Sequence, residues 1–245
     1  MTARARGSRK PRNTAVDPQH LLSTIHHPAG VAARKEARFT PPVATLNRWV
    51  ERIQQHPGLP PGAAATIPWF DPRGGGDQAK VLFLMQDPSK VATGTGFISP
   101  DNDDITARNG TVACDTAGLR RQDRVHWNIF PWWVNVRQKG EPVDSSRPPQ
   151  SHSEAMPLAK ELLGELLLTQ LPALQVVVLL GGQAQSGWDR YLKQGGRVPA
   201  GLLTEPLRCP SCSGMAWNTR NKQTGIKNSQ LTIDALAEAA RLVRA

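Results

Sequence analysis

Three short apolar runs stand out along the chain, at residues 81–85, 125–130 and 176–180. The third contains no alternation of apolar and polar residues, which is typical of a strand buried on both faces. A fourth and weaker run at 202–207 predicts one more short strand. The runs at 81–85, 125–130 and 202–207 lead into segments with polar residues, glycine or proline.

The segments between these runs have a helical spacing of apolar residues. In residues 43–55 the apolar side chains Leu46, Trp49, Val50 and Ile53 share one face. The acidic run at 101–104 fits the start of a helix better than a calcium loop, because it lacks the glycine and terminal glutamate of such loops. The further predicted helices are 104–118, 158–167, 183–192 and 233–243.

Strands that alternate with helices predict an α/β fold with a mostly parallel sheet covered on both faces. We therefore expect a three-layer α/β/α domain around a central four-stranded sheet. Residues 1–40 are rich in Arg, Ala, Pro and His without a sustained period, and we expect a basic, flexible arm there. Residues 41–245 form the single expected domain.

Lysine and arginine total 30 against 20 aspartate and glutamate, so the formal charge is +10. Such a balance favours a polyanionic partner, with nucleic acid as the first candidate. Five of the positive charges fall in the first twelve residues, yet the rest of the chain remains basic without them. A basic tail on an otherwise ordinary enzyme is the alternative.

The chain contains three cysteines, Cys114, Cys209 and Cys212, and no stretch that resembles a signal peptide or a membrane span. This pattern favours a reducing cytoplasm. Cys209 and Cys212 form a Cys-x-x-Cys pair, but zinc and iron–sulfur sites usually need four ligands. A metal-stapled binding module built on the three cysteines is therefore a weaker alternative, and we expect neither a metal nor another cofactor.

Ligands of parallel α/β sheets bind beyond the carboxyl ends of the strands. Three segments follow predicted strands and should meet there: 86–97, 128–133 and 209–217. Their convergence predicts a single site at one edge of the sheet.

Three residues of these segments could carry chemistry. Asp87 can orient a water or stabilise a developing cation, as in the cleavage of a glycosidic bond, although Asp-Pro is also common in turns. Phe97 follows two glycines, and its ring can stack on a flat heterocycle or belong to the core. Asn128 offers a donor and an acceptor that can read one edge of a base, or it can serve a turn.

The segment "MQDPS" at 85–89, with "GTGF" at 94–97, resembles the first motif of the uracil-DNA glycosylase superfamily, closest to its mismatch-specific branch. This resemblance implies that Asp87 orients the attacking water, that Phe97 stacks on the flipped base and that the backbone around Gln86 contacts this base. Asn128 resembles the base-reading asparagine. The small Ser89, where the uracil-strict branch has tyrosine, implies a looser pocket, and the adjacent Lys90 would contact DNA.

The segment "RCPSCSGMAWN" resembles the last motif, a loop that fills the gap left by the flipped base. Most branches begin this motif with His-Pro-Ser, and here Cys209 takes the place of the histidine. A thiol is a weak hydrogen-bond donor, so Cys209 would give the departing base less help. The DNA-binding residues implied by this motif are Pro210, Ser211, Cys212, Ser213, Gly214 and Met215, with Met215 or Cys212 as the wedge.

The resemblance covers about residues 40–245 and implies a monofunctional, monomeric DNA N-glycosylase of base-excision repair. Its partner would be DNA that carries uracil or a related damaged or mismatched base. The alternative is a catalytically weakened relative that binds DNA without releasing a base. A small-molecule α/β enzyme fits the predicted fold but not the charge.

Overall fold

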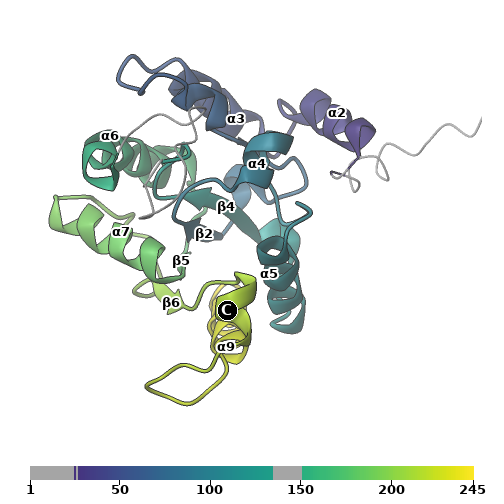
Figure 1. Ribbon diagram of the computed structural model, residues 1–245, viewed down its shortest axis with the longest axis vertical. Coiled ribbons are helices and arrows are strands. Elements are labelled where there is room, and N and C mark those ends of the chain that lie inside the picture. Colours follow the sequence, from purple (N-terminus) through teal and green to yellow (C-terminus); the bar gives the residue numbers. More distant parts are fainter. Residues whose placement is uncertain (1–24, 26, 135–150) are drawn as a thin grey trace, which may run out of the picture.

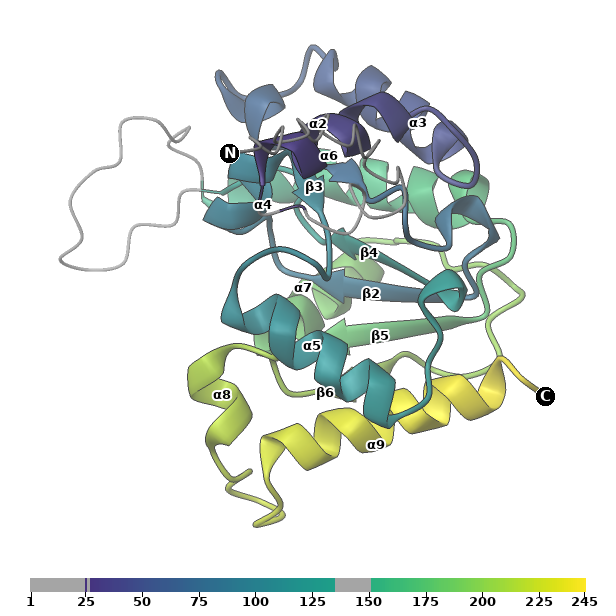
Figure 2. The same ribbon diagram turned by 90° about the vertical axis from the view of Figure 1, so that its right-hand side faces the viewer.

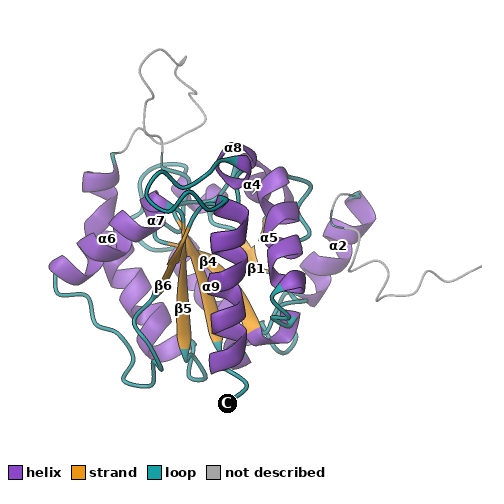
Figure 3. Ribbon diagram, turned by 90° about the horizontal axis from the view of Figure 1, so that it is seen from below, coloured by secondary structure: helices purple, strands orange, loops and turns teal. Residues whose placement is uncertain are grey.

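The computed structural model describes residues 25, 27–134 and 151–245 of the chain. Its centre is a parallel four-stranded sheet with the strand order β4-β2-β5-β6 (Figures 2 and 3). Met85 pairs with Asn128 and Leu180 with Cys209, so the carboxyl ends of the strands meet at one edge. The strands are β2 (Val81–Met85), β4 (Arg124–Asn128), β5 (Val176–Leu180) and β6 (Leu207–Cys209).

Helices cover both faces of this sheet, which makes the fold a three-layer α/β/α sandwich (Figure 1). Alternate residues of β2 serve the two cores: Leu82 and Leu84 belong to one, Val81 and Phe83 to the other. The first core is covered by α3 (Ala44–Gln54), α6 (His152–Glu165) and α7 (Gly182–Lys193). The second is covered by α5 (Ile105–Thr116) and α9 (Asn228–Leu242).

The predicted central elements are confirmed, with one shift. β2 and β5 span the predicted residues, and β4 begins one residue earlier and ends two earlier than expected. The predicted strand at 202–207 is wrong for most of its length, because pairing with β5 starts only at Leu207. Pro206 directly before it has no amide hydrogen to donate to a neighbouring strand.

Several short elements lie outside the predicted pattern. A second sheet pairs β1 (Trp69–Phe70) with β3 (Phe97–Ile98) in parallel. Within the expected loop after β2, α4 (Lys90–Thr95) forms because Ser89 caps its amino end and Gly96, at φ +78°, ends it. The remaining elements are α8 (Gly214–Asn218), the 3₁₀ turns Ala63–Thr66, Gly76–Gln78 and Arg121–Asp123, and the π-helical turn Leu166–Gln170 that continues α6.

The expected boundary between arm and domain at residue 40 needs correction. Residues of the expected arm form helix α2 (Pro28–Ala37), and Arg34 of this helix is completely buried. Arg34 forms ion pairs with Asp71 and Asp101, so α2 belongs to the folded domain. Residues 1–24 of the expected arm lie outside the described residues. In the described part of the chain no helix combines the length and apolar character needed to cross a membrane.

Candidate functional site

A cavity of about 280 Å³ opens at the carboxyl ends of the central strands. The three segments that were expected to converge there do so: the cavity is lined by Gln86 and Asp87 after β2, by Asn128 at the end of β4, and by Ser211 and Cys212 after β6. Its volume lies near the lower limit of small-molecule sites, which span about 300–1,000 Å³. The strand order brings these segments together because β2 lies between β4 and β5.

Asp87 lies at the cavity in the turn after β2. It is half-buried, and its Oδ2 accepts a hydrogen bond from the backbone amide of Val134 at 3.3 Å. This bond ties the turn after β2 to the segment after β4. The carboxylate is thus held at the edge of the sheet, where it borders the cavity.

Gln86, beside Asp87, also lines the cavity, and its side chain is oriented by helix α6. Gln86 Nε2 lies 3.0 Å from His152 Nε2. The backbone carbonyl of Gln86 accepts a hydrogen bond from the backbone amide of Phe130. Burial, followed by the charge of Arg190, lowers the pKa of His152. A neutral imidazole can accept the hydrogen bond from the Gln86 amide, which fixes this amide beside the cavity.

Asn128 is the most unusual polar group of the site. The residue lines the cavity and is only 1% exposed, yet neither Oδ1 nor Nδ2 has a hydrogen-bond partner within the described structure. Buried polar groups without partners are rare and destabilising. A ligand that offers both an acceptor and a donor would satisfy both ends of this amide.

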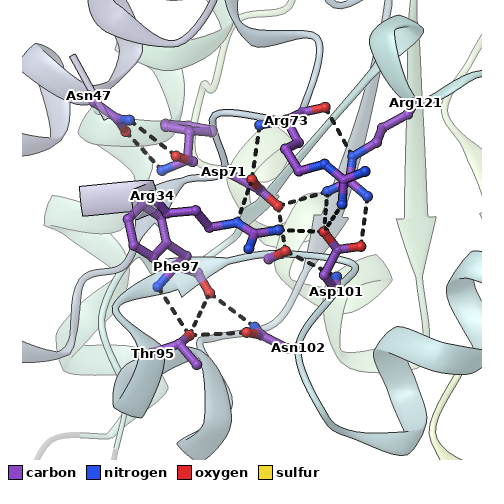
Figure 4. A network of polar contacts seen from close by, with 11 residues as sticks. Arg34, Asn47, Asp71, Arg73, Thr95, Phe97, Asp101, Asn102 and Arg121 are labelled. Carbon is purple, nitrogen blue, oxygen red and sulfur yellow. Dashed lines mark hydrogen bonds and ion pairs between the residues drawn. The ribbon is translucent and has the colours of Figure 1, made fainter. Parts of the chain in front are cut away.

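Phe97 is not where the sequence analysis placed it. The ring is completely buried, and the described residues that line the cavity do not include it. Phe97 pairs with Trp69 in the small sheet, and its carbonyl accepts a hydrogen bond from Asn102 Nδ2 at 3.0 Å (Figure 4). Residues 98–100 face the cavity instead. The expectation that Phe97 faces the ligand is therefore not met, and its alternative as a core residue accounts for the position.

A network of ion pairs, fully buried only at Arg34 and Asp71, lies beside the wall that residues 98–100 form (Figure 4). Asp71, directly after β1, accepts hydrogen bonds from Arg34 Nε at 3.1 Å and from Arg121 Nη2 at 2.8 Å. Arg121 also donates to Asp101 at 2.7 Å. The acidic run that begins with Asp101 thus serves the fold, and Asp104 caps α5 as expected.

Cys209 also departs from its expected place. Its side chain is 1% exposed and packs in the core beneath α9, with Sγ 3.8 Å from the carbonyl oxygen of Leu179. Burial raises the pKa of this thiol. Among the described residues that line the cavity Cys209 is absent, so its predicted catalytic position is wrong. The reason is the pairing of β6 with β5, which turns this side chain toward the helix.

The segment after Cys209 does reach the cavity. Ser211 and Cys212 line it, and the carbonyl of Cys212 accepts a hydrogen bond from Asn109 Nδ2 of α5 at 2.8 Å. Cys212 is 3% exposed, which is incompatible with a role as a wedge. Met215, at the start of α8, is 86% exposed and is the most exposed large apolar side chain of the described structure.

The other predicted DNA-binding residues lie around these groups. Ser89 lines the cavity while its Oγ accepts from the amide of Ala92, and Lys90 begins α4 on the surface. Pro210 is half-buried, and its carbonyl accepts a hydrogen bond from Thr232. Ser213 donates its amide to Ser211 Oγ.

A fourth segment, residues 180–183, also lines the cavity and was not predicted from the sequence. Gly181 has φ +87° and donates its amide to the carbonyl of Cys209, and α7 begins directly after it. The amino end of α7 thus borders the cavity, and the first amides of a helix have no partner inside the helix. The signal that could have revealed this segment is a Gly-Gly pair between a buried strand and a helix.

Two further residues of β4, Arg124 and His126, also line the cavity. They were missed because they precede the strand end, although the two-residue period of a strand places them on the same face as Asn128.

The structure gives no geometric support to the metal-stapled alternative. Cys114, Cys209 and Cys212 are free and buried, and residues 25, 27–134 and 151–245 contain no group of three or more His, Cys, Asp or Glu side chains placed to hold a metal ion. Burial raises the pKa of Cys114 to about 11 and that of Cys212 to about 12. Thiols in this state are poor nucleophiles and poor metal ligands.

Comparison of the chain with models of protein families and with curated proteins finds no match.

Proposed function

We propose that this protein is a monofunctional DNA N-glycosylase that takes a damaged base out of the double helix and hydrolyses its glycosidic bond. The observation that carries the proposal is that Asp87 and Asn128, whose side-chain amide has no partner within the described structure, line the same cavity. The resemblance of residues 85–89 to the uracil-DNA glycosylases and the formal charge of +10 support it.

The base would be recognised by Asn128. Enzymes that act on a base flip it out of the stack and read its hydrogen-bonding edge in a closed pocket. The buried amide of Asn128 presents one donor and one acceptor to such an edge. A base with the wrong edge would leave these groups unpaired, which gives the pocket its selectivity.

Asp87 would act on the sugar. Cleavage of the glycosidic bond passes through a state in which the sugar carries positive charge, and a carboxylate at the mouth of the cavity stabilises this charge or aligns the water that captures it. The departing base carries negative charge, which Cys209 cannot reach. The amino end of α7 at residues 181–183 borders the same cavity and can supply amides and a favourable dipole.

DNA would be held by exposed groups near the cavity. Met215 projects from the segment that lines the cavity and is a suitable wedge for the gap in the stack. Lys90 and the excess of basic residues would neutralise phosphates, so binding should weaken steeply with salt. We further propose that the protein acts as a monomer in a reducing compartment.

The test is base release from an oligonucleotide that contains one uracil opposite guanine, followed by alkaline cleavage of the abasic site. We expect release by the wild type and a loss of about a hundredfold or more in Asp87→Asn. Asn128→Leu should lose a similar factor, because it removes the hydrogen bonds to the base. Asp234→Asn, which removes an exposed carboxylate on α9, is the control and should keep the wild-type rate. Release that is unaffected by Asp87→Asn would contradict the proposed role.

The second candidate is a relative that binds DNA without catalysis. The observation that favours it is that Phe97 and Cys209 are buried and are not among the described residues that line the cavity. It predicts salt-dependent binding to DNA with an abasic site or a mismatch, but no release of uracil, hypoxanthine, xanthine or mismatched thymine by the wild type. Release of any of these bases above the level of Asp87→Asn would reject it.

A further inference from the structure

The cavity is lined by residues along the whole length of β4, and not only by residues at the carboxyl end of the sheet. Its lining includes three residues on one face of β4, namely Asn128 at the end of the strand, then His126, then Arg124 at the start of the strand. At about 3.3 Å per residue, the Cα atoms of Arg124 and Asn128 lie about 13 Å apart. Cys114 of α5 and Leu236 of α9 also line the cavity. The site thus has an inner part beyond the amide of Asn128.

Arg124 brings an unpaired donor to this inner part. The residue is 3% exposed, and its Nε has no hydrogen-bond partner in the described structure. Its Nη1 donates to the carbonyl oxygen of Leu119 at 3.3 Å, and the described part of the chain provides no ion pair for it. A buried guanidinium is normally paired, because removing a charge from water without a partner is costly.

Three carboxylates in this part of the fold, Asp123, Asp71 and Asp101, are engaged with other arginines. Asp123, next to Arg124 in the sequence, accepts two hydrogen bonds from Arg120, at 2.6 and 2.8 Å. Asp71 and Asp101 accept hydrogen bonds from Arg121. Within the described structure the partners of Arg124 are thus uncharged groups, the carbonyl of Leu119 and the thiol of Cys114, and no carboxylate balances its positive charge.

His126 lies between Arg124 and Asn128 on the cavity wall. Burial, together with the charges of Arg124 and Arg121, lowers its pKa to about 3. The imidazole is neutral at physiological pH, and its edge-to-face packing on Phe83 fixes the ring. It can therefore donate or accept one hydrogen bond without adding charge to the inner part of the site.

We infer that the inner part of the cavity, formed by Arg124 and His126, binds the oxygen-bearing far edge of a base larger than a pyrimidine. The chemical class that fits is a deaminated purine, whose second ring extends past Asn128 and whose C6 oxygen accepts a hydrogen bond from Arg124. This inference rests on the proposed function, and it assigns the substrate to the purines, whereas the resemblance implies uracil or a related damaged or mismatched base.

The first test needs only the wild type. Base release is compared for oligonucleotides with hypoxanthine and with unsubstituted purine, which lacks the C6 oxygen, and uracil serves as reference. We expect release of hypoxanthine to exceed that of purine by about a hundredfold, because a site that hydrogen-bonds an oxygen rejects the analogue without it. Equal release of hypoxanthine and purine would overturn the inference. Release of uracil in the same experiment would still support the proposed function.

The second test uses Arg124→Gln, which removes the charge, with Arg124→Lys as the variant that keeps it. We expect Arg124→Gln to lower the ratio of hypoxanthine release to uracil release by about tenfold or more, and Arg124→Lys to lower it less. Thermal unfolding checks that the variants fold, and if Arg124→Gln does not, the wild-type comparison decides. An unchanged ratio in a folded Arg124→Gln variant would overturn the inference.

Calorimetric binding of free hypoxanthine and free purine separates the inference from the proposed function. If no oligonucleotide loses a base, but hypoxanthine binds more tightly than purine and Arg124→Gln removes this difference, the inner site stands and the glycosylase proposal fails. If neither base release nor a difference in binding is observed, both fail.

Discussion

Arg34 Nε lies 3.1 Å from Asp71 Oδ1, and the two side chains are 0% and 3% exposed. This ion pair joins α2 to the segment after β1, across 37 positions of the sequence. Asp101 extends the network to Arg73 and Arg121, directly beside the cavity wall at residues 98–100. The network therefore links the amino-terminal helix to the candidate site.

Removal of one buried partner should be strongly destabilising. Arg34→Met leaves Asp71 and Asp101 without one of their cations, and we expect the free energy of unfolding to fall by about 3–5 kcal/mol. Arg52→Met is the matched control, because Arg52 pairs with Glu165 at 3.4 Å while 60% exposed, and exposed pairs contribute about 0–1 kcal/mol. Urea unfolding measures both. Similar losses in the two variants would show that the network does not stabilise the fold.

Stability should also fall in acid through Asp101. Burial alone would raise the pKa of Asp101, but the hydrogen bond and charge of Arg121, with the charges of Arg73 and Arg34, hold it below its ordinary value of 3.8. The unfolded chain therefore binds this proton at higher pH than the folded chain. The stabilisation is complete above about pH 3.8 and is lost as the pH falls through the lower folded pKa.

Urea unfolding at a series of pH values checks this. The difference in stability between the wild type and Asp101→Asn should shrink below about pH 3.8. Asp103→Asn removes a carboxylate that is 74% exposed and should show no such change. A constant difference between wild type and Asp101→Asn across the acid range would contradict the prediction.

Gly181 should tolerate no side chain. It has φ +87°, and a Cβ there would lie 3.0 Å from the Cβ of Ser211. We expect Gly181→Ala to cost about 1–3 kcal/mol, because L-residues are strained in this backbone conformation. The adjacent Gly182→Ala is the control, since a Cβ there meets no atom within 4 Å. Thermal unfolding of both variants measures the difference, and equal midpoints would contradict the close approach of the two segments.

The cysteines should be chemically inert in the folded protein. Burial raises the pKa of all three thiols, so little thiolate exists at neutral pH. We expect a disulfide reagent to label Cys114, Cys209 and Cys212 slowly in buffer and rapidly in concentrated urea. Labelling is followed by mass spectrometry. Fast labelling of any of them in buffer would show that its thiol is accessible.

Local sequence patterns were sufficient to predict the central strands of the fold. The apolar runs at 81–85 and 176–180 became strands because five consecutive apolar residues between polar or glycine-containing segments suit a short strand buried on both faces. Their order along the chain also predicted where the polar loops meet. Asp87, Gln86 and Asn128 reached one cavity because parallel strands end at a shared edge.

What the sequence by itself determined was the layered sheet, the edge of the sheet where the cavity lies and the presence of a carboxylate and an amide there. Only the tertiary structure decided which way single side chains turn. Phe97 became a core residue through its pairing with Trp69, and Cys209 turned toward α9 through the register of β6. The burial of Arg34 and Arg124 could not be predicted from the sequence either. Basic residues are expected on the surface, and only contacts with residues distant in sequence place these two inside.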